Sequence, residues 1–190
     1  GFLELATEDP DMAHAPEAAE VLARAESAAA RMALLITDLL EFARIGGAQP
    51  TRSEIDISDV MNLVRDDVSR EIEQTHATVS VEAPLHVRGD PTLIRALLQN
   101  LVANAIKFAA ASGVVPRVAI GLTEISSGWR ITVDDNGPGV PIGERDRVFD
   151  LMERGVAADT SGLGIGLSTC RRIVHAHGGT IAIEDSPLGG

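Results

Sequence analysis

The sequence predicts an α+β protein in which a helical hairpin, residues 1–47, precedes a two-layer α/β sandwich, residues 56–190, with a linker at residues 48–55. Three observations predict this organisation. The first part has an apolar seam with heptad spacing, the second part has strands of alternating pattern, and a long capped helix stands among those strands. Helices gathered on one face of a mixed sheet form a sandwich of this kind.

The seam of the first part has the spacing of a coiled-coil helix. Its apolar residues alternate steps of four and three, and Gly46, Gly47 and Pro50 end the pattern. Residues 7–16, rich in proline and acidic residues, precede it as the loop of a hairpin. Two hairpins would bury their seams in a dimeric four-helix bundle; the alternative is a hairpin that packs on its own second part. The seam residues are Val21, Ala25, Ala28, Met32, Leu35, Leu39 and Phe42.

The sandwich is organised around a helix that begins after Asp90, the N-cap, with Pro91 at its first position. Its apolar residues recur at helical spacing, so one face packs on a core. Asn100, Asn104 and Lys107 stand at i, i+4 and i+7, and therefore two carboxamides and one ammonium share a stripe beside that face. Asparagine in a helix is usually exposed and inert, but the pairing beside an apolar face favours a site.

Two glycine-rich segments follow this helix. Asp134–Gly139 comes directly after a strand, where its glycines permit tight turns and close approach of the backbone. Taken alone, it is typical of an ordinary acidic turn. Ser161–Leu167 opens a helix predicted at Ser168–His177, and N–H groups at such a helix start bind anions. Because neither a Gly-Lys-Ser/Thr sequence nor a preceding apolar strand accompanies it, this segment is not a Walker or dinucleotide motif.

Shorter elements complete the predicted sandwich. Cys170 is expected in the core, and Trp129 is expected to anchor a strand. We expect His175 and His177 to interact as charged imidazoles with the dipole of the last helix rather than to bind a metal. The other elements are a helix at Asp56–Gln74 and strands at Thr78–Val81, His86–Val87, Arg117–Ile125, Gly128–Val133 and Thr180–Glu184.

The composition excludes several classes of function. The net charge is −12, from 28 acidic and 16 basic residues, so neither nucleic acid nor an anionic membrane is an expected partner. The single cysteine excludes an internal disulfide and a cysteine-pair zinc site, and it fits a reducing compartment. No apolar run approaches the roughly 20 residues of a membrane span, and the given sequence does not open with the pattern of a signal peptide. The sequence therefore predicts a soluble, cytoplasmic protein.

Four segments of the sandwich, by their order along the chain and their spacing, resemble the ATP-binding domain of sensor histidine kinases, in the GHKL-type ATPase superfamily. The hairpin resembles the dimerisation and phosphoacceptor domain of the same kinases in its final residues, Asp38–Arg44. The four segments that carry the resemblance in the sandwich are an Asn-rich box at Asn100–Phe108, a first glycine box at Asp135–Gly139, an F box at Phe149 and a second glycine box at Gly162–Gly166.

The resemblance implies an ATP-dependent protein histidine kinase that requires Mg²⁺. It implies that Asp135 accepts a hydrogen bond from the adenine amine and thereby selects ATP over GTP. Asn104, supported by Asn100, would bind Mg²⁺, and Lys107 with Arg154 would balance phosphate charge. Residues 150–161 would form an ATP lid. The remaining residues expected to bind the nucleotide are Gly137, Gly139, Gly162, Gly164, Gly166 and Leu167.

The resemblance also implies partners. The expected ones are a second copy, bound through the hairpin, and the receiver domain of a response regulator, whose aspartate would take the phosphoryl group. The phosphorylated histidine is expected upstream of Gly1, because in the family it precedes segments like Gly1–Leu5. His14 is disfavoured, since it lies in the predicted loop without an acidic neighbour. These 190 residues should therefore bind ATP without phosphorylating themselves. Two alternatives stay open. One is a non-catalytic dimeric phosphotransfer or regulatory scaffold, and the other is a clamp ATPase, which needs a glutamate where Gln99 and Asn100 stand.

Overall fold

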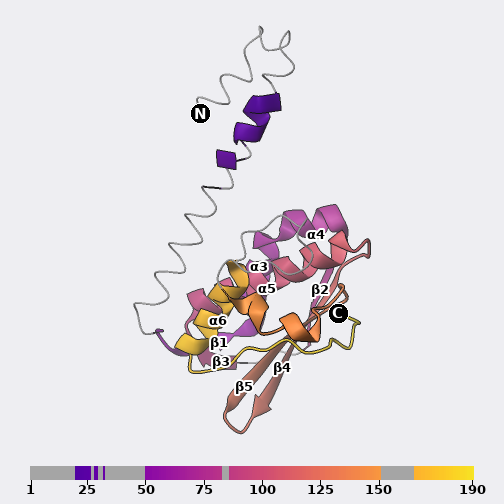
Figure 1. Cartoon of the computed structure of the whole chain (residues 1–190). Coiled ribbons are helices and arrows are strands. Elements are labelled where there is room, and N and C mark those ends of the chain that lie inside the picture. The colour runs from indigo at the N-terminus through magenta and orange to yellow at the C-terminus, as the bar shows by residue number, and fades with distance from the viewer. Residues whose placement is uncertain (1–19, 27, 30–31, 33–49, 83–85, 151–164) are drawn as a thin grey trace. The chain divides into compact units, whose positions relative to one another are not determined.

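The computed structural model describes residues 20–26, 28–29, 32, 50–82, 86–150 and 165–190 (Figure 1). The chain divides into two units, Gly1–Glu41 and Phe42–Gly190. In the first unit the described residues are helical, as the heptad seam predicts. Across the described ranges, no helix combines the length and the hydrophobicity needed to cross a membrane.

The strands of the second unit form two small sheets. In the first, β1 (Ser53–Asp56) pairs antiparallel with β3 (His86–Gly89). In the second, the order is β2-β4-β5. Here β2 (Thr78–Val81) runs parallel to β4 (Arg117–Ile125), and β5 (Gly128–Asp135) returns antiparallel to β4. This sheet is mixed, as predicted, and the bounds of β2 and β4 agree with the sequence analysis.

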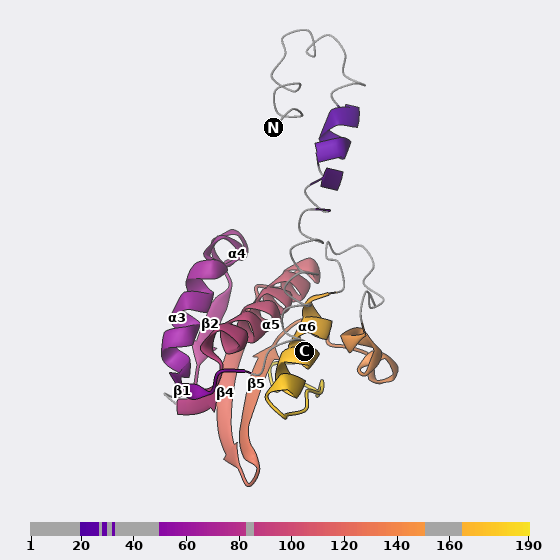
Figure 2. The ribbon, with the colours of Figure 1, turned by 90° about the vertical axis from the view of Figure 1, so that its left-hand side faces the viewer.

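The helices form the second layer. The long helix α5 (Pro91–Ala111) packs on β4 and β5, and it is flanked by α3 (Ile57–Asp67) and α6 (Gly166–Ala176) (Figure 2). A short helix, α4 (Ser69–Thr75), follows α3. Two single 3₁₀ turns, η2 at Ile142–Glu144 and η3 at Arg147–Phe149, lie in the connection that follows β5. The α+β sandwich predicted for this part of the chain is therefore confirmed.

Two apolar clusters hold the layers together. The larger one lies between the sheet and the helices, where Leu98 and Val102 of α5 meet Ile120 of β4. All three side chains are almost completely buried. The smaller cluster joins α5 to α6 through Leu97, Cys170 and Ile173. Because burial of such a side chain stabilises a fold by about 1.5–3 kcal/mol, the position of α6 depends on its contact with α5.

The helix predicted at Asp56–Gln74 is two helices. Asp56 caps the first, with its Oδ1 atom accepting from the amide of Ser58 at 2.8 Å. The break falls at Val68, whose φ and ψ are −105° and 17° and whose side chain is buried. Next to it, the Ser69 hydroxyl donates to the carbonyl of Asp66 at 2.8 Å. A hydroxyl that binds a nearby carbonyl competes with the helical hydrogen bonds, which explains why the pattern alone did not predict the break.

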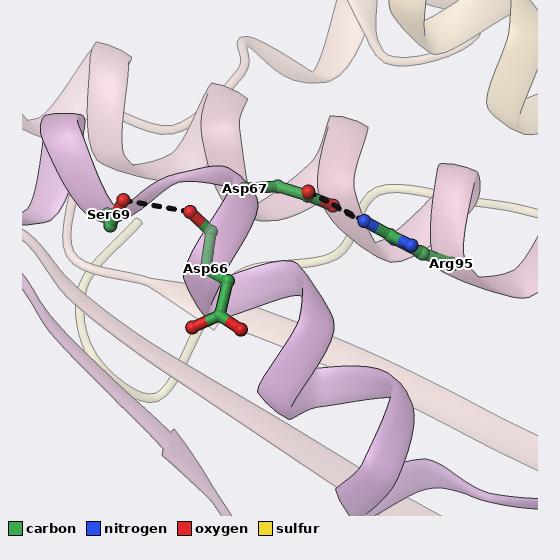
Figure 3. Close-up of polar contacts among 4 residues, drawn as sticks. All are labelled: Asp66, Asp67, Ser69 and Arg95. Atoms are coloured by element: carbon green, nitrogen blue, oxygen red, sulfur yellow. Dashed lines mark hydrogen bonds and ion pairs between the residues drawn. The ribbon is translucent and has the colours of Figure 1, made fainter.

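An ion pair ties the end of α3 to α5. Arg95 donates from Nε and Nη2 to the two carboxylate oxygens of Asp67, at 2.9 and 2.7 Å (Figure 3). The side chain of Asp66, the preceding residue, points away from this pair (Figure 3). The bidentate geometry orients both groups, and the hydrogen bond that Arg95 donates to Asp67 raises the pKa of Arg95.

Two predicted elements differ from the structure. The linker was expected to extend to residue 55, but β1 begins at Ser53, because an edge strand of four residues is defined by its partner β3. The strand predicted at Thr180–Glu184 is irregular backbone. A turn follows it, in which Ser186 donates to the carbonyl of Gly190. The chain then contacts β5 through Gly190, whose amide donates to the carbonyl of Asp135 at 3.1 Å.

Trp129 does not anchor a strand in the core. It lies near the tip of the β4–β5 hairpin, opposite Glu124, and 37% of its surface is exposed. The hairpin extends beyond the helices at this end (Figure 2). The side chain therefore has few neighbours, although its alternation with Ile131 correctly predicts a strand.

Candidate nucleotide-binding site

The predicted carboxamide stripe lies on α5. Asp90 caps this helix as predicted: its Oδ1 atom accepts from the amides of Thr92 and Leu93, at 3.0 and 3.2 Å. Asn100 is half-buried, and its Nδ2 donates to the carbonyl of Ala96 at 2.9 Å. This bond fixes the carboxamide plane, so the oxygen of Asn100 is directed away from its own helix turn.

The start of α6 meets this stripe. A β-carbon added at Gly166 would lie 2.7 Å from Oδ1 of Asn100 and 3.8 Å from Nδ2 of Asn104. The structure thus brings together three predicted site residues from two segments that are distant in the sequence. The N-cap of α6 is Ile165, whose side chain has no oxygen that could accept from the first amides of the helix. Those amides are suited to an anion.

The first glycine segment approaches α5 further along the helix. Asp135 ends β5, and its Oδ1 atom accepts from the amide of Gly137 at 2.7 Å. A β-carbon at Gly137 would lie 3.3 Å from the backbone nitrogen of Ala109. Gly139 adopts a φ of +68°, which a residue with a side chain adopts at a cost. Asn104, near Gly166, and Ala109, near Gly137, are about 7.5 Å apart along the helix axis. Both glycine segments therefore pack against the same helix, α5.

Asn136 has a structural role that the sequence analysis did not predict. Its Oδ1 accepts from the amide of Arg117 at 2.8 Å, and its Nδ2 donates to the carbonyl of Val115 at 3.0 Å. These two bonds fasten the glycine turn to the start of β4. The signal in the sequence was the Asn-Gly pair, since asparagine in a turn often binds backbone groups, but the partners are about 20 positions away and cannot be inferred locally.

Other predicted site residues are placed individually. Lys107 is half-buried on α5, with its ammonium 5.1 Å from the ring centroid of Phe108, a cation–π contact. Leu167 is half-buried in the first turn of α6. The positions of Arg154, Gly162 and Gly164, and nearly all of the predicted lid, lie outside the described residues.

Two residues expected to have no role in binding are also placed. Cys170 is completely buried, as predicted, and burial raises the pKa of its thiol to about 12. His177 interacts with the end of α6, as predicted, through Nδ1 and the carbonyl of Ile173 at 2.8 Å. The expectation that its ring is charged is wrong, because its Nε2 accepts from the amide of Asp90 at 3.0 Å and must therefore lack a proton. Within the described ranges, no group of three His, Cys, Asp or Glu side chains is placed so that it could hold a metal ion.

A magnesium nucleotide fits these residues. Carboxamide and carboxylate oxygens are hard ligands of the kind that Mg²⁺ accepts, together with water and phosphate oxygens. Because Gly166 lacks a β-carbon, the start of α6 can lie close to the side chains of Asn100 and Asn104. Phosphate oxygens could therefore approach the amides of α6 while remaining next to Asn100 and Asn104.

The comparison with known families agrees with this geometry. Residues 89–190 match the family described as histidine kinase-, DNA gyrase B-, and HSP90-like ATPase. The match covers more than half of the chain, from the end of β3 to the terminal residue, and includes both glycine segments. The chain belongs to this family, and the predicted resemblance to the ATP-binding catalytic domain of histidine kinases is confirmed.

Individual relatives support the same assignment. The sensor-type histidine kinase PrrB of Mycobacterium leprae is 35% identical over 136 residues, which are 72% of this chain and 30% of PrrB. The adaptive-response sensory kinase SasA of Trichormus variabilis is 32% identical over 179 residues, 90% of this chain and 43% of SasA. The solved structure of full-length ShkA in complex with AMPPNP has a TM-score of 0.70 at 27% identity, covering 90% of this chain and 36% of ShkA. The chain spans less than half the length of each.

Proposed function

We propose that this chain is the catalytic core of a sensor histidine kinase. It binds ATP with Mg²⁺ between α5 and the two glycine segments. The γ-phosphoryl group then passes to a histidine on a helical hairpin, from which an aspartate of a response regulator takes it. The observation that carries this proposal is the approach of Gly166 to Asn100 and Asn104, because it joins metal-type ligands to a helix start suited to phosphate.

Each site residue has a role in this proposal. Asn104 and Asn100 hold the metal ion, which neutralises phosphate charge when bound. Asp135 accepts from the adenine amine; one of its oxygens already binds the Gly137 amide, and an ionised carboxylate has further acceptor positions. Lys107 and Arg154 stabilise charge on the transferred group. The amides of the second glycine segment bind the phosphates, and positioning of this kind is most of what phosphoryl transfer requires.

Dimerisation through the hairpin belongs to the same proposal. Two seam residues on the described helix of the first unit, Val21 and Met32, are 65% and 57% exposed in the single chain. Apolar side chains repeated at heptad spacing on an exposed helix face are suited to burial against a second copy. The phosphoacceptor histidine is expected outside these 190 residues, and His14 lies outside the described part.

One experiment separates the kinase from its alternatives. ATP binding, ATP hydrolysis and acid-labile phosphate incorporation are measured on this chain and on a version extended at its N-terminus. A kinase core binds ATP in both forms but incorporates label only in the extended one. Rapid hydrolysis without label would indicate a clamp ATPase, which the amide side chains of Gln99 and Asn100 disfavour, since neither can act as a general base. Absence of binding would indicate a non-catalytic scaffold.

A further inference from the structure

The N-terminus of α5 is joined to the C-terminus of α6 by one imidazole. The amide of Asp90 donates to Nε2 of His177 at 3.0 Å, and Nδ1 of His177 lies 2.8 Å from the carbonyl of Ile173. A backbone amide only donates and a carbonyl only accepts, so Nε2 is the acceptor and Nδ1 carries the hydrogen. Each ring nitrogen therefore has one fixed role.

The ring fits here because β3 ends in glycine. A β-carbon at Gly89 would lie 3.3 Å from both Cδ2 and Nε2 of His177, and 2.5 Å from Cδ1 of Ile94. A side chain at residue 89 would therefore require the Ile94 side chain to move and would crowd the ring of His177. The local packing holds His177 close to the cap of α5.

The segment that enters the sandwich is attached at the same point. The amide of Thr51 donates to Oδ2 of Asp90 at 3.0 Å, and Nη2 of Arg52 donates to the carbonyl of His177 at 3.2 Å. The other oxygen of Asp90 caps α5. Asp90 and His177 thus connect α5, α6 and the segment that precedes β1. We call the four residues Thr51, Arg52, Asp90 and His177 the junction.

The junction lies at the opposite end of the helix pair from the candidate site. From Asp90 to Asn100 is ten residues along α5, and from His177 to Gly166 is eleven along α6. Asn100 contacts Gly166 at one end, and Asp90 contacts His177 at the other. The two helices therefore run antiparallel over about 15 Å, so a tilt at the junction alters the separation of Gly166 from Asn100.

We propose that Asp90 and His177 are positioning residues for nucleotide binding, and that Thr51 and Arg52 transmit the position of the incoming segment to the spacing of α5 and α6. This inference rests on the proposed function. The junction touches no nucleotide in this proposal; it acts through the separation between Gly166 and the two asparagines.

A matched pair of substitutions tests the role of the ring. His177→Gln places an amide oxygen at the distance of Nε2 and keeps an acceptor for Asp90, whereas His177→Asn reaches only as far as Nδ1. We expect His177→Asn to weaken the affinity for Mg·ATP about fivefold, which corresponds to the loss of one hydrogen bond. We expect His177→Gln, which keeps the acceptor, to weaken it by less than about twofold. A lowered melting temperature with unchanged affinity in His177→Asn would show a merely structural residue and overturn the proposal.

A double-mutant cycle tests the incoming segment. Arg52→Ala should weaken Mg·ATP binding two- to fivefold, roughly the effect of one lost hydrogen bond. It should have no further effect in the His177→Asn background: that substitution keeps the backbone carbonyl that Arg52 binds, but it removes the bond between the ring and Asp90 through which α6 is held to α5. The control is Arg88→Ala, which removes the same charge from an exposed position on β3. Additive effects of the two substitutions, or an equal effect of Arg88→Ala, would contradict transmission through the junction.

Amide hydrogen exchange separates a failure of this inference from a failure of the proposed function, since it needs no nucleotide. His177→Asn should accelerate exchange in the first turn of α6, around Thr169, as well as at Asp90. If the unsubstituted chain does not bind Mg·ATP, the proposed function is wrong. The coupling between the junction and the start of α6 is tested by hydrogen exchange alone, whatever the result of the binding experiment. Acceleration confined to the neighbourhood of Asp90 would overturn the link itself.

Discussion

Gly166 and Asn100 are in such close contact that a methyl group on Gly166 would stand 2.7 Å from the carboxamide oxygen of Asn100. This single contact joins the helix that carries the predicted metal ligands to the helix whose first amides face the predicted phosphates. It was expected only from a resemblance between short sequence boxes. In the structure it is a direct approach of α6 to α5, and it leads to the first prediction.

Gly166→Ala should weaken the affinity for Mg·ATP by about tenfold or more. The added methyl group requires either Asn100 or the start of α6 to move, and displacement of a group that binds a charged ligand costs about 1.5–3 kcal/mol. Calorimetry gives the affinity. The control is Gly143→Ala on η2, where an added β-carbon has no neighbour within 4 Å. Equal affinities for the two variants would show that the contact has no role in binding.

Asn136→Ala should both destabilise the sandwich and weaken nucleotide binding. Loss of the bonds to Arg117 and Val115 removes about 1–2 kcal/mol from the free energy of unfolding and releases the glycine turn from β4. Urea unfolding and calorimetry measure the two effects. Asn62→Ala, at an exposed position on α3, is the matched control. If Asn136→Ala resembles this control in both measurements, the turn does not depend on the asparagine.

The buried thiol predicts a pH dependence of stability. Burial raises the pKa of Cys170 from 9.0 to about 12, so in this interval the folded chain keeps a proton that the unfolded chain has lost. The resulting stability is complete below pH 9 and falls as the pH rises toward 12, by up to about 1.4 kcal/mol per pH unit. The difference in unfolding free energy between the original chain and Cys170→Ala should therefore shrink by about 1 kcal/mol between about pH 8 and pH 10.

Parallel pH profiles of the two proteins would contradict this account of Cys170. A second measurement checks it independently. At about pH 8 the native thiol should resist a disulfide reagent and should react once urea unfolds the chain, because the thiolate is the reactive form.

The elements that the sequence predicted well are those with local signals. The start of α5 follows from Asp90 and Pro91, which cap the helix without any distant partner. The bounds of β4 follow from alternation and from the turn at its end. Asn100 and Asn104 were placed on one face by helical spacing alone. In each case the information lies within a few residues of the element.

The features that the sequence did not predict depend on distant partners. The strand β1 exists because it pairs with β3, and Asn136 binds groups near residues 115–117. The break at Val68 reflects a buried side chain and a hydroxyl bond that an amphipathic pattern does not reveal. The neutral state of the His177 ring is set by the amide of Asp90, 87 residues away in the chain. Such contacts become visible only once the fold is known.

Titration of the chain with Mg·ATP by calorimetry, alongside Asn104→Ala and the exposed control Asn62→Ala, tests the central claim most directly. The account predicts measurable binding by the original chain, unchanged binding by Asn62→Ala, and a loss of about tenfold or more in Asn104→Ala, since a ligand to a charged group is removed. Absence of heat with the original chain, or equal affinity in Asn104→Ala, would contradict the proposal that α5 and its two glycine partners bind a magnesium nucleotide.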